Sequence, residues 1–318
     1  MIELDGVTKY YGNYPAITDI TFRVEKGEAV GFLGPNGAGK STTMKIITGF
    51  IPPTSGTCSV AEYDIVNQSI YARRHIGYLP ETVPLYADMA VSDYLRFMGK
   101  IRGMSRERIK SRISEVIEIC RLQDYRQSYI GKLSKGYRQR VGIAQSILHE
   151  PDVLVLDEPT IGIDPIQVVE TRNLIRDLAG EHTLIVSTHI LPEVSMICER
   201  VIIIHEGQIV AVDRPENLAT RLRGVERIEI DVRGPSKEII AAVKDVEGVS
   251  GVERKPNPGS ADFTTYEIEG TRGGDLRALI AASVVQKGWN LLRLQAVGMT
   301  LEEIFLRLTT TEEQLPES

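Results

Sequence analysis

The sequence predicts an α/β protein in which helices cover a parallel sheet, followed by a smaller α+β domain. Continuous runs of Val, Ile and Leu over residues 29–33, 153–157 and 183–188 are typical of parallel strands that are buried on both faces. Helix-like segments alternate with these strands up to about residue 215, which favours an α/β architecture. The chain has 318 residues, enough for about two domains at roughly 150 residues each.

The composition is that of an ordinary soluble protein. The 37 basic and 43 acidic side chains give a formal net charge of −6, which argues against a duplex nucleic-acid partner. No apolar run approaches the ~18 residues that span a bilayer, and no signal peptide is visible. Three cysteines at unrelated spacings fit neither a disulfide framework nor a metal site: Cys58, Cys120 and Cys198. We therefore expect a cytoplasmic protein.

Patterning places the domain boundaries as follows: the α/β domain at 1–222, a more charged helical insert within it at about 82–150, a second domain at 225–310 and a flexible tail at 311–318. The second domain shows strand and helix patterns in β-α-β-β-α-β order, which is that of a ferredoxin-like fold. Ser236 is expected to cap its first helix, and a capping-box pattern at Thr300 and Glu303 predicts a final helix.

A glycine-rich loop follows the first buried strand. Residues 34–41, Gly-Pro-Asn-Gly-Ala-Gly-Lys-Ser, match the phosphate-loop pattern G-x-x-x-x-G-K-[ST] at every fixed position. Glycines allow backbone N–H groups to approach phosphate oxygens, and the following helix N-terminus adds partial positive charge. We expect Lys40 to contact the β- and γ-phosphates and the Ser41 hydroxyl to ligate Mg²⁺. The predicted nucleotide-binding residues of this loop are Gly34, Pro35, Asn36, Gly37, Ala38, Gly39, Lys40, Ser41 and Thr42.

A pair of carboxylates ends the second buried strand. Asp157 and Glu158 stand where a Walker B motif has its acidic residues. We expect Asp157 to bind Mg²⁺ directly or through water, and Glu158 to polarise the attacking water.

Residues 133–140, Leu-Ser-Lys-Gly-Tyr-Arg-Gln-Arg, precede this carboxylate pair. With the phosphate loop and the Walker B pair, they make residues 1 to about 222 resemble the ATP-binding-cassette (ABC) ATPases, whose signature is Leu-Ser-Gly-Gly-Gln, often followed by Gln-Arg. A serine at a helix N-cap suits a γ-phosphate through its hydroxyl and the free amides. The matching positions are Ser134, Gly136, Gln139 and Arg140, and the departures are Lys135 and Tyr137.

The resemblance assigns four further positions. Tyr11 stands where the family stacks an aromatic ring on adenine, with Tyr10 as the alternative. Asp164 matches the D-loop, and His189 matches the switch histidine that contacts the γ-phosphate. Glu81 stands where many members have the Q-loop glutamine; a carboxylate there can still ligate Mg²⁺.

The resemblance implies an ATPase subunit of an ABC transporter. Two copies, identical or different, would form a head-to-tail dimer with two ATP molecules between them, in which Ser134, Gly136 and Asp164 act on the partner's nucleotide. Glu158 and His189 would support hydrolysis. A separate polytopic membrane subunit would dock near the Glu81 loop and the helical insert, placing the chain on the inner face of the membrane. The motifs Gly-Tyr-Leu-Pro-Glu at 77–81 and Leu-Glu-Glu-Ile-Phe at 301–305 resemble exporter-type subunits of multidrug efflux, sodium efflux, polysaccharide export or gliding motility.

Several alternatives stay open at this point. A non-transport ABC ATPase that acts on ribosomes or DNA would share every phosphate motif, whereas a P-loop kinase or GTPase would not explain the signature. The second domain has no catalytic constellation, so it is either a structural or dimer-stabilising appendage or a ligand sensor. Seven basic residues between positions 96 and 112 form either solvated helix faces or a contact with phospholipid headgroups or a membrane partner.

Overall fold

The computed structural model describes residues 1–215, 217, 226–255, 263–270 and 276–297. The chain divides into two compact units, the first beginning at Met1 and reaching Pro215, and the second lying within Glu216–Arg307. The predicted final helix with Thr300 and Glu303, and the predicted tail at 311–318, lie outside the described residues.

A six-stranded sheet forms the centre of the first unit, in the order β10-β9-β3-β8-β7-β6. Five strands run parallel, and β10 pairs antiparallel to β9 at one edge. The predicted strands 29–33, 153–157 and 183–188 are confirmed. The strands are β3 (Ala29–Leu33), β6 (Ile76–Leu79), β7 (Val153–Asp157), β8 (Thr183–Thr188), β9 (Arg200–His205) and β10 (Gln208–Asp213).

Both faces of this sheet are buried, which explains the continuous apolar runs. Along β7, Val153 and Val155 pack into one hydrophobic core, whereas Leu154 and Leu156 pack into the other. The first core also contains helix α1 (Lys40–Ile47) and a second, antiparallel sheet in the order β2-β1-β4-β5. The strands of that sheet are β1 (Ile2–Tyr11), β2 (Tyr14–Val24), β4 (Ser55–Val60) and β5 (Tyr63–Asp64).

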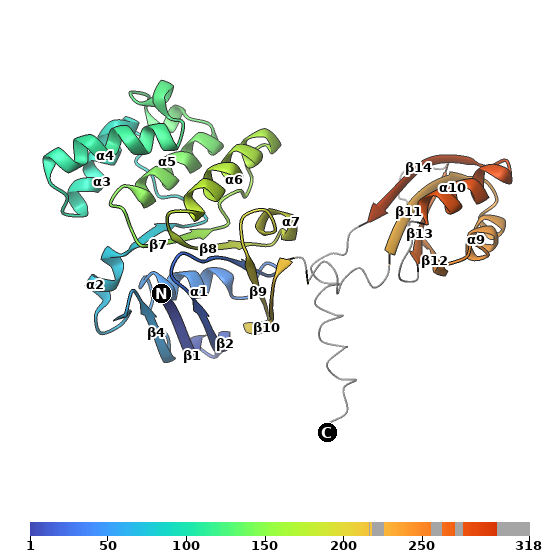
Figure 1. The fold of residues 1–318 in the computed structure, drawn as a ribbon, viewed down its shortest axis with the longest axis horizontal. Coiled ribbons are helices and arrows are strands. Elements are labelled where there is room, and N and C mark those ends of the chain that lie inside the picture. Colours follow the sequence, from blue (N-terminus) through green and yellow to red (C-terminus); the bar gives the residue numbers. More distant parts are fainter. Residues whose placement is uncertain (216, 218–225, 256–262, 271–275, 298–318) are drawn as a thin grey trace. The chain divides into compact units, whose positions relative to one another are not determined.

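Helices cover the opposite face of the central sheet, as Figure 1 shows for α3 to α6 above β7 and β8. Tyr94 is fully buried there, and its hydroxyl donates to Oε1 of Gln145 (2.8 Å), which joins α3 to α5. The helices of this unit are α2 (Ser69–Arg74), α3 (Val91–Ile101), α4 (Arg106–Ile119), α5 (Lys135–Ile147), α6 (Pro165–Ala179) and α7 (Leu191–Val194), with 3₁₀ turns at Gln123–Tyr125 and Ile130–Lys132. Within the described residues, no helix has the length and apolar character that crossing a membrane requires.

The second unit has the predicted β-α-β-β-α-β order, and its antiparallel sheet is ordered β12-β13-β11-β14. Alternate residues of β11 are buried against both helices in one core. The expectation for Ser236 was wrong: α9 begins at this residue after Pro235, and no side-chain hydrogen bond caps the helix. The elements are β11 (Glu226–Arg233), α9 (Ser236–Lys244), β12 (Val249–Lys255), β13 (Thr264–Gly270), α10 (Arg277–Gln286) and β14 (Asn290–Val297).

The three cysteines form no disulfide, as their spacing predicts, and all three are buried. Burial raises the pKa of each thiol, those of Cys58, Cys120 and Cys198, to about 12. Because thiolates are the reactive form, these cysteines are chemically inert packing residues.

Candidate active site

The phosphate loop lies between β3 and α1, where its glycines are required for steric reasons. Gly39 has φ of +106°, and a Cβ there would lie 2.5 Å from Cγ2 of Ile17. A Cβ at Gly34 would overlap the carbonyl oxygen of Ile204 in β9. The loop can therefore keep this shape, with the N-terminus of α1 facing the pocket, only with glycine at both positions.

Lys40 is almost completely buried inside the loop. Its Nζ atom donates hydrogen bonds to the carbonyl oxygens of Gly34 (2.8 Å) and Pro35 (3.1 Å). The same atom lies 3.2 Å from Oε1 of Glu158. One buried ammonium thus joins the phosphate loop to the end of β7.

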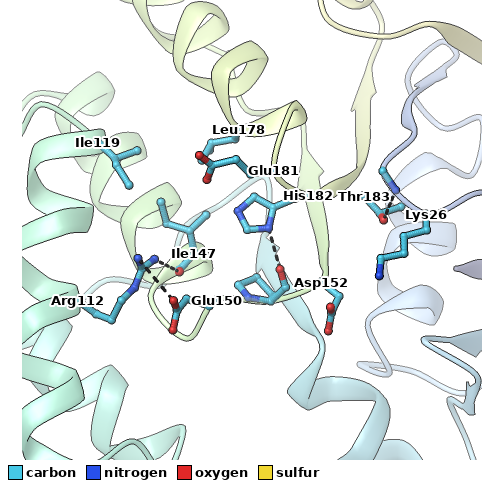
Figure 2. A pocket seen from close by; sticks show the side chains of 12 residues that line it. Lys26, Arg112, Ile119, Ile147, Glu150, Asp152, Leu178, Glu181, His182 and Thr183 are labelled. Atoms are coloured by element: carbon cyan, nitrogen blue, oxygen red, sulfur yellow. Dashed lines mark hydrogen bonds and ion pairs between the residues drawn. The ribbon is translucent and has the colours of Figure 1, made fainter.

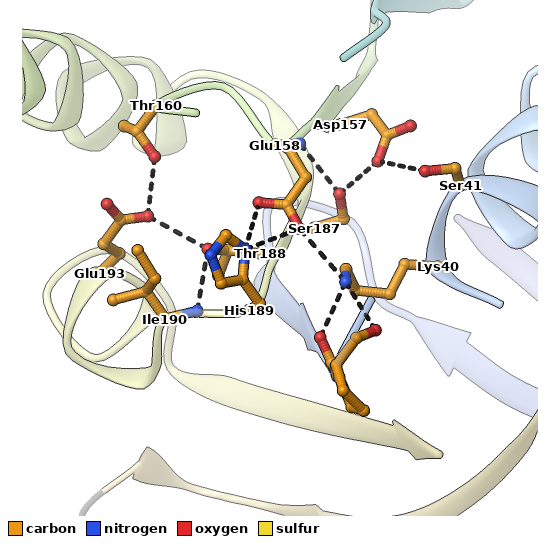
Figure 3. A network of polar contacts seen from close by, with 12 residues as sticks. Lys40, Ser41, Asp157, Glu158, Thr160, Ser187, Thr188, His189, Ile190 and Glu193 are labelled. Carbon is orange, nitrogen blue, oxygen red and sulfur yellow. Dashed lines mark hydrogen bonds and ion pairs between the residues drawn. The ribbon is translucent and has the colours of Figure 1, made fainter. Parts of the chain in front are cut away.

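Asp157 forms a second link between these elements (Figure 3). Its Oδ1 atom accepts hydrogen bonds from the hydroxyls of Ser187 (2.5 Å) and Ser41 (3.3 Å). Ser187 lies directly beside Asp157 because β7 and β8 pair in register at these residues. Sequence reasoning missed Ser187, although a serine near the end of an apolar strand was a visible signal.

Glu158 is held in an unusual backbone conformation. Its φ is +48°, a region that non-glycine residues rarely adopt. Its N–H group donates to both the carbonyl oxygen (3.1 Å) and the hydroxyl (3.0 Å) of Ser187. These bonds keep the backbone in place and turn the carboxylate toward the phosphate loop.

His189 completes a three-residue cluster at the carboxylate. Its Nδ1 atom lies 3.2 Å from Oε1 and 3.0 Å from Oε2 of Glu158. The carboxylate is 5% exposed and contacts Lys40 on one side and His189 on the other. The structure therefore brings together Lys40, Glu158 and His189, three residues that the sequence analysis assigns to the site.

A network behind His189 holds the end of β8. Oε2 of Glu193 accepts hydrogen bonds from the hydroxyls of Thr160 (2.8 Å) and Thr188 (3.1 Å). The Thr188 hydroxyl in turn accepts a hydrogen bond from the N–H group of Ile190 (3.1 Å). This network supports the loop that carries His189 (Figure 3), and no motif in the sequence indicated it.

The phosphate loop opens into a pocket of about 500 Å³. Tyr11, Glu81 and Glu158 all line it, so three residues that were assigned to the site by separate motifs lie in one cavity. Tyr14 also lines it, directly opposite Tyr11 in the β1–β2 hairpin, and was missed in the sequence. The lining residues are Tyr11, Tyr14, Ala16, Asn36, Gly37, Gly39, Lys40, Ser41, Thr42, Glu81, Glu158 and Ile161.

The signature and D-loop residues lie together, but away from the lining of that pocket. Ser134 caps α5, its Oγ accepting from the N–H group of Tyr137 (3.4 Å). Asp164 caps α6, its Oδ1 accepting from the N–H group of Gln167 (3.1 Å). A Cβ at Gly136 would overlap Oε1 of Gln167, so the first turns of α5 and α6 are in direct contact.

A second pocket, of about 360 Å³, lies at the amino ends of β7 and β8 (Figure 2). Among its lining residues, Arg112 pairs with Glu150, and Nδ1 of His182 contacts the carbonyl oxygen of Pro151 (2.7 Å). Ligands of open α/β sheets bind outside the carboxyl ends of the strands. The phosphate-loop pocket, at those carboxyl ends, is therefore the candidate active site.

This fold and site define a P-loop ATPase. A family profile described as "ABC transporter" matches residues 17–161. The linearmycin resistance ATP-binding protein LnrL of Bacillus subtilis (strain 168) is 32% identical over 320 residues, which cover 97% of this chain and 98% of that protein. The Nod factor export ATP-binding protein I of Burkholderia orbicola (strain AU 1054) is 32% identical over 318 residues, covering 98% of each chain. A solved ATP-binding subunit of an ABC transporter matches with a TM-score of 0.63 and 30% identity, covering 70% of this chain and 92% of that one.

The chain belongs to the ABC transporter family, as an ATP-binding and ATP-hydrolysing subunit. Transporter subunits that match over nearly the whole length decide against the alternative of an ABC ATPase that acts on ribosomes or nucleic acid.

Proposed function

We propose that this ATPase drives export through a separate polytopic membrane subunit, working as a Mg²⁺-dependent dimer at the inner face of the cell membrane. The observation that carries the catalytic part is the Glu158 carboxylate, buried between Lys40 and His189 at the phosphate-loop pocket. The export direction rests on the full-length similarity to a Nod factor export protein.

The residues around the pocket have distinct roles in hydrolysis. Lys40 and the loop amides bind the β- and γ-phosphates, and Tyr11 stacks on the adenine. Glu158 accepts a proton from the water that attacks the γ-phosphorus, while the bond to the β,γ-bridging oxygen breaks. His189, which contacts both carboxylate oxygens, orients Glu158 and faces the transferred phosphoryl group.

The residues near the loop fit a magnesium ion. Asp157 is 1% exposed, and its partners among the described residues are two hydroxyls rather than a cation. Burial and the carboxylates of Asp157 and Glu81 raise the pKa of Tyr78, so both carboxylates lie near one side chain. Mg²⁺ is usually held by one or two carboxylates together with substrate phosphates. Ser41, Asp157 and Glu81 would hold the ion, which would neutralise charge on the phosphates.

The position of the signature supports a dimer. Ser134, Gly136 and Asp164 lie together at the N-terminal ends of α5 and α6 and do not line the phosphate-loop pocket of their own chain. A second copy facing head to tail would bring them to that pocket. If ATP binds the closed dimer more tightly than the open dimer, it shifts the population toward the closed dimer. Hydrolysis of ATP would then return the dimer to the open form.

A groove of about 820 Å³ supports the docking of a membrane subunit. Exposed apolar side chains line it, including Phe50 (72% exposed) and Ile101 (62%). Ile76 and Tyr78 of β6 also line it, and this strand leads directly to Glu81. A helix docked here could therefore act on the ATP site through β6.

Three arginines in the groove define the chemistry of its occupant. The guanidinium of Arg102 donates to the carbonyl oxygen of Arg73 (2.9 Å), and burial together with the charge of Arg73 lowers the pKa of Arg102. Arg74 lies over the ring of Tyr71 at 5.7 Å. Within the described residues, these arginines have no carboxylate partner, so we propose a cytoplasmic permease helix with apolar and acidic side chains.

Reconstitution tests this function. The tagged chain is expected to co-purify in stoichiometric amounts with a polytopic membrane protein from gently solubilised membranes. In vesicles with the ATPase facing outward, ATP should then drive cargo into the lumen. Absence of a membrane partner, or movement of cargo out of the lumen, would contradict the proposal.

A further inference from the structure

Gln167, in the first turn of α6, contacts all three residues that the proposed dimer uses in trans. Its backbone N–H group donates to Oδ1 of Asp164 (3.1 Å), and its side-chain Nε2 atom donates to Oγ of Ser134 (3.4 Å). Its Oε1 atom packs against Gly136, where a Cβ would overlap it. One residue therefore joins the D-loop, through its backbone, to the signature, through its side chain.

The hydroxyl of Ser134 has two acceptor lone pairs and a single donor hydrogen. The N–H group of Tyr137 and the Nε2 atom of Gln167 both donate to this oxygen, at 3.4 Å each. With both acceptor positions in use, the hydroxyl hydrogen is left to point outward from an exposed residue. A phosphate oxygen is an acceptor only, so this arrangement suits it.

The orientation of the Gln167 amide follows from the surroundings. Its Oε1 atom is buried against Gly136 and has no hydrogen-bond partner. The reverse orientation would bury two N–H donors there in place of one acceptor, which leaves more polar groups unsatisfied. It would also let the Ser134 hydroxyl donate inward to Gln167, away from solvent.

We propose that Gln167 is a positioning residue, which holds the Ser134 hydroxyl as a hydrogen-bond donor toward the γ-phosphate bound by a second copy of the chain. This role rests on the proposed dimer, in which Ser134 acts in trans. Gln167 touches no phosphate itself and works through Ser134.

The neighbouring ion pair offers a matched control. Arg140 of α5 pairs with Glu170 of α6, and Arg140 is almost completely buried. Glu170→Gln weakens the contact between the same two helices without touching Ser134. A purely structural role of Gln167 would therefore give the same kinetic pattern as this variant.

The test is a double-mutant cycle on the full chain, measured as kcat/KM for ATP hydrolysis. Gln167→Ala is expected to lower kcat/KM by about threefold to tenfold, the effect of one hydrogen bond. In a Ser134→Ala background it should have no further effect, whereas Glu170→Gln should have the same effect in both backgrounds. Equal losses for Gln167→Ala with and without the Ser134 hydroxyl, or no loss at all, would overturn the proposal.

Gln167→Glu separates hydrogen bonding from packing. The two side chains have nearly the same shape, but an ionised carboxylate only accepts, so it would draw the Ser134 hydroxyl hydrogen toward itself. We expect this variant to lose more activity than Gln167→Ala, and an activity equal to that of the parent would overturn the proposal. Binding of a fluorescent ATP analogue to the phosphate loop of the same chain should stay unchanged in each variant, which reports intact folding.

The dimer itself is tested in parallel by light scattering of Glu158→Gln with ATP. If no ATP-dependent dimer forms, the proposed dimer and the role of Gln167 both fail. If the dimer forms but the losses in the cycle are additive, only the role of Gln167 fails.

Discussion

Nδ1 of His189 lies 3.0 Å from Oε2 of Glu158, a carboxylate whose other oxygen lies 3.2 Å from Nζ of Lys40. The two partners of the carboxylate come from distant parts of the chain: His189 directly follows β8, and Lys40 is the first residue of α1. A carboxylate so placed between two nitrogen donors is held in one orientation, as a general base must be.

Glu158→Gln should abolish most hydrolysis while keeping ATP binding. The amide keeps the shape of the side chain but cannot accept the proton of the attacking water, so we expect the turnover number to fall by about 100-fold or more. Steady-state ATPase assays and nucleotide titrations measure the two properties separately. A variant that hydrolyses ATP at the parental rate would contradict the role of Glu158 as the base.

Lys40→Ala should weaken nucleotide binding by roughly 10-fold to 100-fold, because a charge-assisted contact to phosphate is lost. Calorimetric titration with ATP measures this change. Lys45→Ala, at the other end of α1, is the matched control and should bind normally. Equal affinities for the parent and Lys40→Ala would contradict the phosphate contact.

Glu81→Gln should retain ATP binding and change the magnesium dependence of turnover. The substitution removes one negative oxygen ligand from the pocket that also contains Ser41. ATPase activity measured over a range of magnesium concentrations tests this. Superimposable titrations for the parent and the variant would exclude Glu81 as a metal ligand.

Ser187→Ala should lower the free energy of unfolding by about 1–3 kcal/mol, because a buried carboxylate and a buried N–H group each lose a partner. The Ser187 hydroxyl donates a hydrogen bond to Oδ1 of Asp157 (2.5 Å) and accepts one from the N–H group of Glu158 (3.0 Å). Urea denaturation measures the loss. Ser195→Ala, which removes an exposed hydroxyl bonded to the carbonyl oxygen of Leu191, should change stability far less.

His149 should make the first unit less stable in mild acid. Burial, with the positive charge of Arg102 as the next cause, lowers the pKa of His149 to about 4. The unfolded chain binds this proton near pH 6.5, so stability is retained above that pH and falls as the pH drops toward 4, by up to about 3 kcal/mol. Urea denaturation at pH 7 and pH 5 should show a smaller difference for His149→Gln than for the parent. An unchanged difference would exclude His149 as the cause.

Local patterns predicted much of the fold and most of the cluster. Strands β3, β7 and β8 begin and end where the apolar runs do, because both faces of the sheet are buried. The phosphate loop, Asp157, Glu158 and His189 were recognisable because each lies at the end of a buried strand or directly after it. The cap predicted at Ser236 failed because Pro235 occupies the N-cap position, so the helix begins at Ser236 itself, one residue earlier than the pattern implied.

The sequence by itself determined the class of the protein, its phosphate-binding loop and its principal acidic residues, since these depend on residues adjacent in the chain. Only the tertiary structure decided which other side chains support them. Ser187 reaches Asp157 through the register of two parallel strands, and Gln167 reaches Ser134 through the packing of α5 against α6. Contacts between elements distant in sequence depend on how those elements pack in three dimensions, and no local spacing records that packing.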